Sequence, residues 1–323
     1  MVKISRDRKI MTTSAIKISI IAPVFNEEAV VHEFYERTRV ALETLGNSFE
    51  IIFIDDGSQD QTLANIKSLR SADERVKAVS FSRNFGHPVA ISAGLDHAAG
   101  AVVIIMDADL QDPPEVLPKF LEKWREGYKV VYGIRKKRKE GFLKRFCYWA
   151  FYRIFRRLAS LQDAPLDSGD FSLLDRVVVE YLKALPERNR FMRGLRSWVG
   201  FRQCGVEYER AGRFAGSTKY PFKKLVKLAV DGIFSFSQIP LRLATFLGFF
   251  IAFAALVAIL VLLYLRLTQG VLGIQGFAAT IIIVLFLGAI QLISIGILGE
   301  YVGRIYEEVK QRPIYIIKEK IGF

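Results

Sequence analysis

Cysteine is scarce in this chain, which has two cysteines among 323 residues. Cys147 and Cys204 do not have the spacing of metal ligands, so the sequence excludes a zinc module and a disulfide framework, and we expect both thiols to be structural. Internal repeats, low-complexity segments and Gly/Ser-rich linkers are also absent, which excludes a repeat architecture. A secretory signal is lacking as well, because the basic residues at 3, 6, 8 and 9 precede no apolar stretch before Ile16. We expect residues 1–15 to be a disordered basic lead.

Charge is absent from two long stretches late in the sequence, residues 243–265 and 267–299. The apolar part of the second stretch covers residues 277–298. A helix needs roughly 20 apolar residues to cross the hydrocarbon core of a bilayer, so residues 242–300 predict a hairpin of two transmembrane helices. The alternative is a pair of buried core helices, which are seldom so long and so free of charge.

The flanks of these stretches are basic, whereas the connection over residues 268–276 has no charge. The bases are Lys219, Lys223, Lys224, Lys227 and Arg242 before the first span, and Arg304, Lys310, Arg312, Lys318 and Lys320 after the second. By the positive-inside rule both flanks are cytoplasmic. We therefore expect a multi-pass membrane protein whose larger domain (residues 16–219), tail (301–323) and both termini are cytoplasmic.

The formal net charge of +13 fits three kinds of partner: nucleic acid, phosphate ligands or an anionic membrane surface. Because two spans are predicted, we expect the membrane surface and phosphates, and no nucleic acid. Residues 142–160 and 220–236 interleave basic and aromatic side chains at helical spacing, which predicts interfacial amphipathic helices, the second within residues 220–241. The alternative for each is an amphipathic helix packed on a sheet. Glycines at 296, 299 and 303 permit close helix contact, which favours a homo-oligomer only weakly.

Apolar runs typical of strands alternate with segments of helical spacing in the first part of the chain. The predicted strands cover residues 18–22, 49–54, 76–81, 102–106 and 130–133, and the predicted helices cover residues 28–45, 61–69, 87–98 and 113–126. This alternation predicts an α/β fold with a mostly parallel, doubly wound sheet. We expect Pro23 to close the first strand, Asn26 to cap the first helix, Ser58 or Asp60 to cap the second, and His87 to be a cap or packing residue.

Polar residues follow each predicted strand: Asn26 and Glu27, Asp55 and Asp56, residues 82–84, Asp107 and Asp109, and Arg135. In a parallel sheet the carboxyl ends of the strands share one edge, where open α/β sheets bind ligands. Two close carboxylates such as Asp107 and Asp109 can hold Mg²⁺ or Mn²⁺, which in turn binds a diphosphate. Taken alone, such a pair is more often a solvated turn, so this interpretation depends on the rest of the chain.

Five ordered motifs carry a resemblance to a known family. They are Ala22-Pro23-Val24-Phe25-Asn26-Glu27-Glu28, Asp55-Asp56-Gly57-Ser58-x-Asp60, Arg83-Asn84-Phe85-Gly86, Asp107-Ala108-Asp109-Leu110-Gln111-Asp112-Pro113-Pro114 and Arg213-x-x-Gly216-x-Thr218-Lys219-Tyr220. Together they resemble the family-2 glycosyltransferases of GT-A (Rossmann-like) fold, and most of all the polyprenyl-phosphate glycosyltransferases related to dolichyl-phosphate mannose synthase. A closer resemblance, to the bacterial branch that makes polyprenyl-phosphate glucose, is carried by three features: the two predicted spans, the segment 299–306, and Arg312-Pro313.

The resemblance implies an enzyme of the bacterial cytoplasmic membrane. It would transfer glucose from UDP-glucose to undecaprenyl phosphate with inversion and with Mg²⁺ or Mn²⁺, and the product would serve surface polymer glycosylation. The resemblance also implies that Pro23, Phe25, Glu27 and Asp56, with Asp55 beside them, line the nucleoside pocket, where a carboxylate accepts from the base or ribose.

Further roles follow from the same resemblance. Asp109 would ligate the metal directly, Gln111 would be a second ligand, and Asp107 would lie near both the metal and the sugar or ribose. The metal would act as a Lewis acid on the departing UDP. Arg213 and Lys219, with Gly216 and Thr218 in the same motif, would lie on a flexible segment that binds diphosphate or lipid phosphate, and Arg135 would join them. Asp170 would orient the lipid phosphate or bind sugar hydroxyls. A general-base role is less favoured, because the acceptor is already an anion.

Several alternatives stay open at the level of sequence. A related enzyme would use GDP-mannose to make dolichyl- or polyprenyl-phosphate mannose, and a protein of another class would be an inactive membrane-anchored interaction partner. Intact carboxylates at Asp107 and Asp109 favour an enzyme. A processive polysaccharide synthase is disfavoured, because Arg196-Ser197-Trp198 does not match the Gln-x-x-Arg-Trp block of those enzymes.

Overall fold

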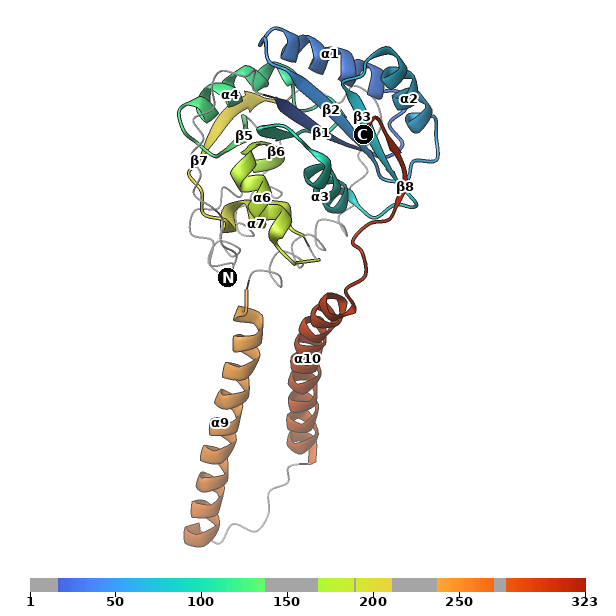
Figure 1. Cartoon of the computed structure of the whole chain (residues 1–323). Helices are drawn as coiled ribbons and strands as arrows, with labels where there is room; N and C mark the ends of the chain where they lie inside the picture. The colour runs from blue at the N-terminus through green and yellow to red at the C-terminus, as the bar shows by residue number, and fades with distance from the viewer. Residues whose placement is uncertain (1–16, 137–167, 189, 211–236, 270–276) are drawn as a thin grey trace. The chain divides into compact units, whose positions relative to one another are not determined.

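The computed structural model describes residues 17–136, 168–188, 190–210, 237–269 and 277–323 (Figure 1). The chain divides into two units. The first comprises residues 1–145, 163–219 and 313–323, and the second comprises residues 146–162 and 220–312. The predicted basic lead and both predicted interfacial helices lie outside the described residues.

The first unit contains a sheet of eight strands in the order β7-β5-β6-β4-β1-β2-β3-β8. The strands are β1 (Ile18–Val24), β2 (Phe49–Asp55), β3 (Val76–Phe81), β4 (Val102–Ile105), β5 (Val130–Lys136), β6 (Ser168–Asp175), β7 (Gln203–Glu209) and β8 (Ile317–Ile321). Strands β1 to β4 are mutually parallel, and β5 is parallel to β7, whereas β6 and β8 run antiparallel to their neighbours. The predicted mostly parallel α/β sheet is confirmed, with all five predicted strands present.

Helices cover both faces of the sheet (Figure 1). They are α1 (Val31–Glu43), α2 (Thr62–Ala72), α3 (His87–His97), the short 3₁₀ helix η1 (Pro114–Val116), α4 (Leu117–Arg125), α6 (Arg176–Ala184) and α7 (Met192–Trp198). Helices α1, α2 and α4 lie on one face, and α3, α6 and α7 lie on the other. Every residue of β1, β2 and β4 is buried, as expected for central strands covered on both sides.

The loop after β1 differs from the sequence prediction. Pro23 does not close the strand but lies within it, opposite Ile54 of β2. Asn26 does not cap α1, which begins at Val31, and its φ of 53° places it in the left-handed region. Its Oδ1 instead accepts a hydrogen bond from the N–H of Gln59 (2.9 Å). The loops after β1 and β2 are therefore held together.

Strand β8 differs from the sequence prediction, in which residues 301–323 are a tail. It pairs antiparallel with β3 and covers an edge that would otherwise present unpaired backbone groups. Just before it, the ring of Tyr315 stacks on Phe81 at 5.1 Å between centroids, and its hydroxyl donates to Asp96 (2.9 Å). The chain thus returns after its last long helix and completes the sheet of the first unit.

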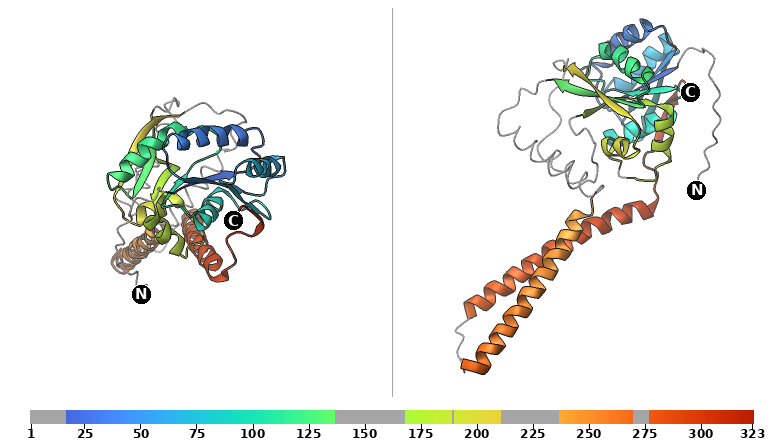
Figure 2. Two further views of the ribbon diagram at one scale, coloured as in Figure 1. Left: turned by 45° about the horizontal axis from the view of Figure 1, so that its top comes forward. Right: turned by 90° about the vertical axis from the view of Figure 1, so that its left-hand side faces the viewer.

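The second unit contains two long apolar helices, α9 (Ile239–Gln269) and α10 (Phe277–Lys310). Both are long and apolar enough to cross a membrane, in agreement with the predicted hairpin. They lie next to each other in Figures 1 and 2. The hydroxyl of Tyr301 donates to the carbonyl oxygen of Ser237 (2.6 Å) and links α10 to the residues that precede α9.

Candidate active site

The carboxyl ends of the central parallel strands lie at one edge of the sheet. In register, the end of β2 at Asp55 lies opposite Val24 of β1, and β1 also pairs with β4. Because β6 runs antiparallel to β4, its first residues lie at the same edge, and Asp170 is thereby brought toward the loop after β4. The sheet topology therefore brings side chains from distant parts of the sequence to one place.

Asp107 and Asp109 lie in the loop after β4. About a third (34%) of the Asp107 side chain is exposed, yet its Oδ1 is buried and has no hydrogen-bond partner. Burial and the nearby carboxylates of Asp112, Asp170 and Asp109 raise the pKa of Asp107 to about 6, although His87 opposes the rise. Asp109 Oδ1 accepts a hydrogen bond from the N–H of Gln111 (3.1 Å). The loop thus concentrates negative charge where a cation would be stabilised.

His87 lies between two of these acids, contrary to its prediction as a cap or packing residue. Its Nε2 is 3.4 Å from Asp107 Oδ1 and 3.7 Å from Asp170 Oδ2. Burial alone would lower the pKa of His87, but Asp107 and Asp170 raise it to about 9. The imidazole is therefore charged at neutral pH and links the two carboxylates. Its place at the start of α3, after Gly86 with φ of 101°, determines this position.

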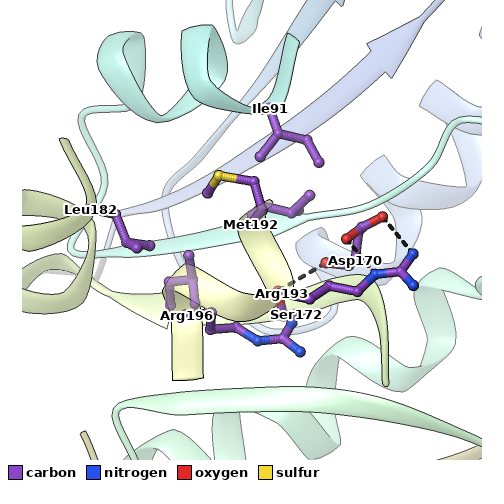
Figure 3. Close-up of a pocket in the computed structure, with 9 residues that line it drawn as sticks. Ile91, Asp170, Ser172, Leu182, Met192, Arg193 and Arg196 are labelled. Atoms are coloured by element: carbon purple, nitrogen blue, oxygen red, sulfur yellow. Dashed lines mark hydrogen bonds and ion pairs between the residues drawn. The ribbon is translucent and has the colours of Figure 1, made fainter. Parts of the chain in front are cut away.

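Asp170 is held by a fork of two hydrogen bonds (Figure 3). Arg193 of α7 donates from Nε to one carboxylate oxygen and from Nη2 to the other, each at 2.9 Å. Burial would raise the pKa of Asp170, but Arg193 and His87 hold it well below its usual value. Arg196, one turn further along α7, is only 4% exposed and lines the same small cavity as Asp170 and Arg193. Neither arginine is predicted as a site residue by the sequence.

A fourth acid, Asp112, is buried within the loop after β4. The hydroxyl of Tyr208 on β7 donates to Asp112, and Arg135 Nε donates to the same hydroxyl (3.2 Å). Arg135 Nη2 is 3.7 Å from Asp112 Oδ1, and its guanidinium lies against the backbone of Gly169, where a Cβ would approach Nη2 to 3.0 Å. Arg135 therefore lies against Gly169 and close enough to Asp107 to interact with it electrostatically, as part of a polar cluster that supports the loop.

The acids after β2 hold neighbouring loops in place. Asp55 accepts from the hydroxyl of Ser80 (2.7 Å) and from a backbone N–H in its own turn. Asp56 accepts from the N–H groups of Phe85 (2.6 Å) and Gly86 (2.9 Å). Burial raises the pKa of Asp56. Both carboxylates therefore accept hydrogen bonds that hold the loops after β2 and β3 in place, and these loops form one wall of the site.

The remaining predicted residues fall into two groups. Pro23 is buried in β1, while Phe25 and Glu27 are partly exposed in the loop that follows it. Arg213, Gly216, Thr218 and Lys219 lie outside the described residues. The structure thus brings together Asp107, Asp109, Asp170 and Arg135.

The residues at this edge fit a divalent cation. Within the part of the chain that the structure describes, no three His, Cys, Asp or Glu side chains are grouped as metal ligands. Mg²⁺ and its relatives are commonly bound by one or two carboxylates together with substrate phosphates and water, so two protein carboxylates suffice. Two observations fit such an ion: the buried Oδ1 of Asp107 makes no hydrogen bond, although His87 lies 3.4 Å from it, and the pKa of the Asp107 carboxyl is raised.

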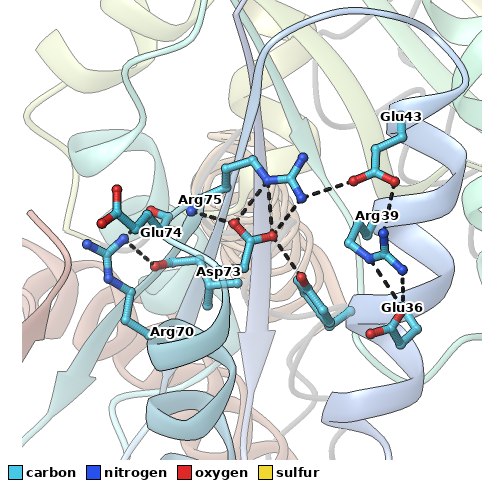
Figure 4. Close-up of polar contacts among 9 residues, drawn as sticks. Glu36, Arg39, Glu43, Arg70, Asp73, Glu74 and Arg75 are labelled. Carbon is cyan, nitrogen blue, oxygen red and sulfur yellow. Dashed lines mark hydrogen bonds and ion pairs between the residues drawn. The ribbon is translucent and has the colours of Figure 1, made fainter.

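A second charged network lies at the opposite end of the strands (Figure 4). Asp73, just before β3, accepts from Arg75 Nε and Nη2 and from the hydroxyl of Tyr35 (2.7 Å). Burial would raise the pKa of Asp73, but Arg75 and Tyr35 lower it to about 2. Arg75 also bonds Glu43 of α1 (3.0 Å). Carboxylates and guanidinium groups alternate in this network, so we regard it as structural.

Comparison with known proteins agrees with this arrangement. The model of the family described as glycosyl transferase family 2 matches residues 19–182. The uncharacterized glycosyltransferase YkcC of Bacillus subtilis is 46% identical over 308 residues, which cover 95% of each chain. The SfII prophage-derived bactoprenol glucosyl transferase of Shigella flexneri is 46% identical over 306 residues, covering 94% of this chain and 98% of the relative.

Among solved structures, glucosyl-3-phosphoglycerate synthase from Mycobacterium tuberculosis aligns with a TM-score of 0.47 and 21% identity, covering 68% of this chain and 76% of that one. This likeness is distant, so the family assignment depends on the sequence relatives. They match nearly the whole chain and include bactoprenol glucosyl transferases, which agrees with the branch that the motifs predicted. The chain belongs to glycosyl transferase family 2 and is a glycosyltransferase.

Proposed function

We propose that the protein transfers glucose from UDP-glucose to a polyprenyl phosphate at the cytoplasmic face of a bacterial membrane. Relatives named bactoprenol glucosyl transferases, 46% identical over nearly the whole chain, support the glucosyl group and the lipid acceptor. Two helices of membrane-spanning length support the membrane location. In this proposal the catalytic domain and both termini are cytoplasmic, as the distribution of basic residues favours.

The geometric observation that carries the proposal is the pair of carboxylates after β4. Asp107 and Asp109 lie at the sheet edge where nucleotides bind in open α/β folds, and the buried Oδ1 of Asp107 makes no hydrogen bond and lies 3.4 Å from His87 Nε2. In the proposed enzyme Asp109 ligates a divalent cation, with Asp107 and Gln111 beside it. When bound, this ion would supply Lewis-acid stabilisation of the negative charge on departing UDP.

Pro23, Phe25 and Glu27, with the wall formed by Asp55 and Asp56, would line the nucleoside pocket. Since both acids already accept hydrogen bonds from the protein, their part is to shape this wall. Such support fixes the position of a bound nucleotide relative to the carboxylates after β4.

The reaction would be a single displacement at the anomeric carbon. A phosphate oxygen of the acceptor forms the new bond to C1 of glucose, the bond between C1 and the UDP oxygen breaks, and UDP leaves with the electron pair. The α-linked donor thereby gives a β-linked product. The acceptor oxygen is already an anion near neutral pH, so no proton has to be removed.

Asp170 is accordingly an orienting group in this proposal. Its pKa is held well below the usual value, mainly by Arg193 against the effect of burial, and a carboxylate of low pKa is a poor general base. The segment with Arg213, Gly216, Thr218 and Lys219 would add cationic contacts to phosphate. Arg135 would act near Asp107 while it supports Asp112.

The experiment is sugar transfer by detergent-purified protein. Radiolabelled UDP-glucose and GDP-mannose are offered in parallel with undecaprenyl phosphate, and label is counted in the organic phase. We expect label from UDP-glucose and a loss of at least about 100-fold in Asp109→Ala. Label from GDP-mannose alone would overturn the proposed donor, and no labelled lipid from either donor, with protein that still binds UDP, would overturn the acceptor.

A further inference from the structure

The loop after β3 contains the motif at residues 83–86, to which the proposed reaction gives no role. Its backbone donates two hydrogen bonds to the Asp56 carboxylate, from the N–H groups of Phe85 (2.6 Å) and Gly86 (2.9 Å). A Cβ at Gly57 would lie 2.6 Å from a backbone atom of the motif, so the loops after β2 and β3 are in direct contact. Whatever holds the loop after β3 therefore also holds one wall of the proposed nucleoside pocket.

The residues just before β8 contact this loop from another side, and β8 itself lies beside β3 (Figure 1). The N–H of Ser82, the first residue after β3, donates to the carbonyl oxygen of Ile316 (3.0 Å). The ring of Phe81, the last residue of β3, stacks on Tyr315 with 5.1 Å between centroids. The same ring packs edge-on against Phe85 of the motif at 5.7 Å. One buried ring thus joins the C-terminal residues of the chain to the wall of the pocket.

The position of the Tyr315 ring is itself fixed by two elements. Its hydroxyl donates to the carboxylate of Asp96 on α3 (2.9 Å). The pairing of β3 with β8 is regular from Ala78 to Ser80 and shifts register at Phe81, where the stacking begins. Such irregularities redirect the side chains next to them. Tyr315 is therefore a fixed support against which Phe81 can pack.

The loop after β3 has little buried surface of its own to hold it in one conformation. Ser82, Arg83 and Asn84 are exposed, and the guanidinium of Arg83 lies over the ring of Phe85 at 4.0 Å. A loop with few buried contacts opens easily unless its neighbours hold it. If the wall of a pocket is already held before the ligand arrives, less ordering entropy is lost on binding. The ring contacts from the C-terminal residues provide this support.

We propose that Tyr315 is a positioning residue for the sugar-nucleotide donor. Its ring holds Phe81 and, through Phe81, the loop after β3, so that the wall of the nucleoside pocket is kept in the conformation that binds a nucleoside diphosphate. The inference rests on the proposed donor pocket and extends its support to the last strand of the chain. Tyr315 acts through Phe81 and the loop, so its effect belongs to donor binding and not to the lipid acceptor.

The test measures the Kd for UDP by titration calorimetry, in Mn²⁺, with the full-length detergent-purified protein. Tyr315→Leu removes the ring and keeps an apolar side chain, and Tyr315→Phe keeps the ring without the hydroxyl. Ile321→Ala is the matched control, because Ile321 packs on the core at the other end of β8, opposite Ala78. Thermal unfolding is recorded for each variant, and binding is measured below the temperature at which unfolding begins.

In Tyr315→Leu we expect the Kd for UDP to rise at least about 3-fold, because an aromatic pair that holds the loop is lost. Tyr315→Phe should stay within about two-fold of the wild type, since the ring remains. Ile321→Ala should lower Tm, because apolar packing of β8 is lost, and leave the Kd within about two-fold.

Two results would overturn the assignment while the wild type binds UDP. One is an unchanged Kd in Tyr315→Leu, and the other is an equal loss of affinity in Tyr315→Leu and Ile321→Ala, which would mean that β8 acts only through stability. The KM for undecaprenyl phosphate should stay within about two-fold in Tyr315→Leu, and a rise equal to that of the KM for UDP-glucose would also contradict a role in donor binding. A wild type that binds no UDP would overturn the proposed donor itself.

Discussion

Replacement of Asp107 by asparagine should stabilise the metal-free protein while it abolishes sugar transfer. In the folded chain, burial and three nearby carboxylates raise the pKa of Asp107 from 3.8 to about 6, after the opposing effect of His87 is included. The ionised form that is present at neutral pH is therefore less favourable in the folded chain than in the unfolded one. Asparagine removes this charge and keeps nearly the same shape.

The size of the effect follows from the pKa. A rise from 3.8 to about 6 corresponds to about 3 kcal/mol of folding free energy above pH 6. Because 34% of the side chain is exposed, water screens part of this penalty, and we expect about 1–2 kcal/mol. For a catalytic domain of this size, that corresponds to a rise in Tm of about 2–8 °C.

The assay is thermal unfolding of the detergent-purified protein in EDTA, followed by tryptophan fluorescence. Since the folded-state pKa is raised, the penalty is present above about pH 6 and fades as the pH falls toward 3.8, so the gap between wild type and variant should be smaller at pH 5 than at pH 7.5. Glu122→Gln, an exposed position on α4, is the control and should leave Tm unchanged.

Adding Mn²⁺ and UDP should raise the Tm of the wild type and should have much less effect on Asp107→Asn, because binding to the folded state stabilises it. A variant that melts below the wild type in EDTA at pH 7.5, or a gap that widens at pH 5, would refute this explanation of the carboxylate cluster.

Three further predictions concern stability. His87→Gln should lower Tm most below pH 6.5, and the difference from the wild type should vanish as the pH rises through about 9, the raised pKa of His87. A Tm difference that does not depend on pH would contradict the ion pairs of His87 with Asp107 and Asp170. Asp73→Asn should lower the free energy of unfolding in urea by about 1–2 kcal/mol at pH 7, and this loss should shrink as the pH falls from 3.8 toward 2. A loss that stays constant with pH would exclude the ionic network of Figure 4. Tyr315→Phe removes the hydrogen bond to Asp96 and should cost about 1 kcal/mol without changing the transfer rate; a normal Tm would show that this contact does not hold β8.

Much of the sheet was predictable from local pattern. The five predicted strands are apolar runs bounded by polar turns, and parallel strands that are buried on both faces have that appearance. Strand β7 has an alternating, half-exposed sequence, and β8 is only five residues long with three charges, so neither has a strong local signal. Strand β8 forms because the chain returns to pair with β3, which is a tertiary effect.

Site residues could be predicted only where they follow a predicted strand directly in the sequence. Asp107 and Asp109 were found from the strand before them, and convergence with Asp170 follows from the sheet topology. Arg193 and His87 were missed or undervalued, since α7 has only seven residues and His87 has the local pattern of a helix start. Their roles depend on packing of α3 and α7 near β6, which no window of sequence contains.

The proposed metal-dependent transfer is tested most directly by glucose transfer from UDP-glucose to undecaprenyl phosphate by the purified wild-type protein, measured in EDTA and again after excess Mn²⁺ or Mg²⁺ is added. We expect almost no labelled lipid in EDTA, recovery of the rate on addition of the metal, and no recovery in Asp109→Ala. Equal transfer in EDTA and in metal would contradict a cation held by Asp107 and Asp109, and the carboxylate pair after β4 would then need another explanation.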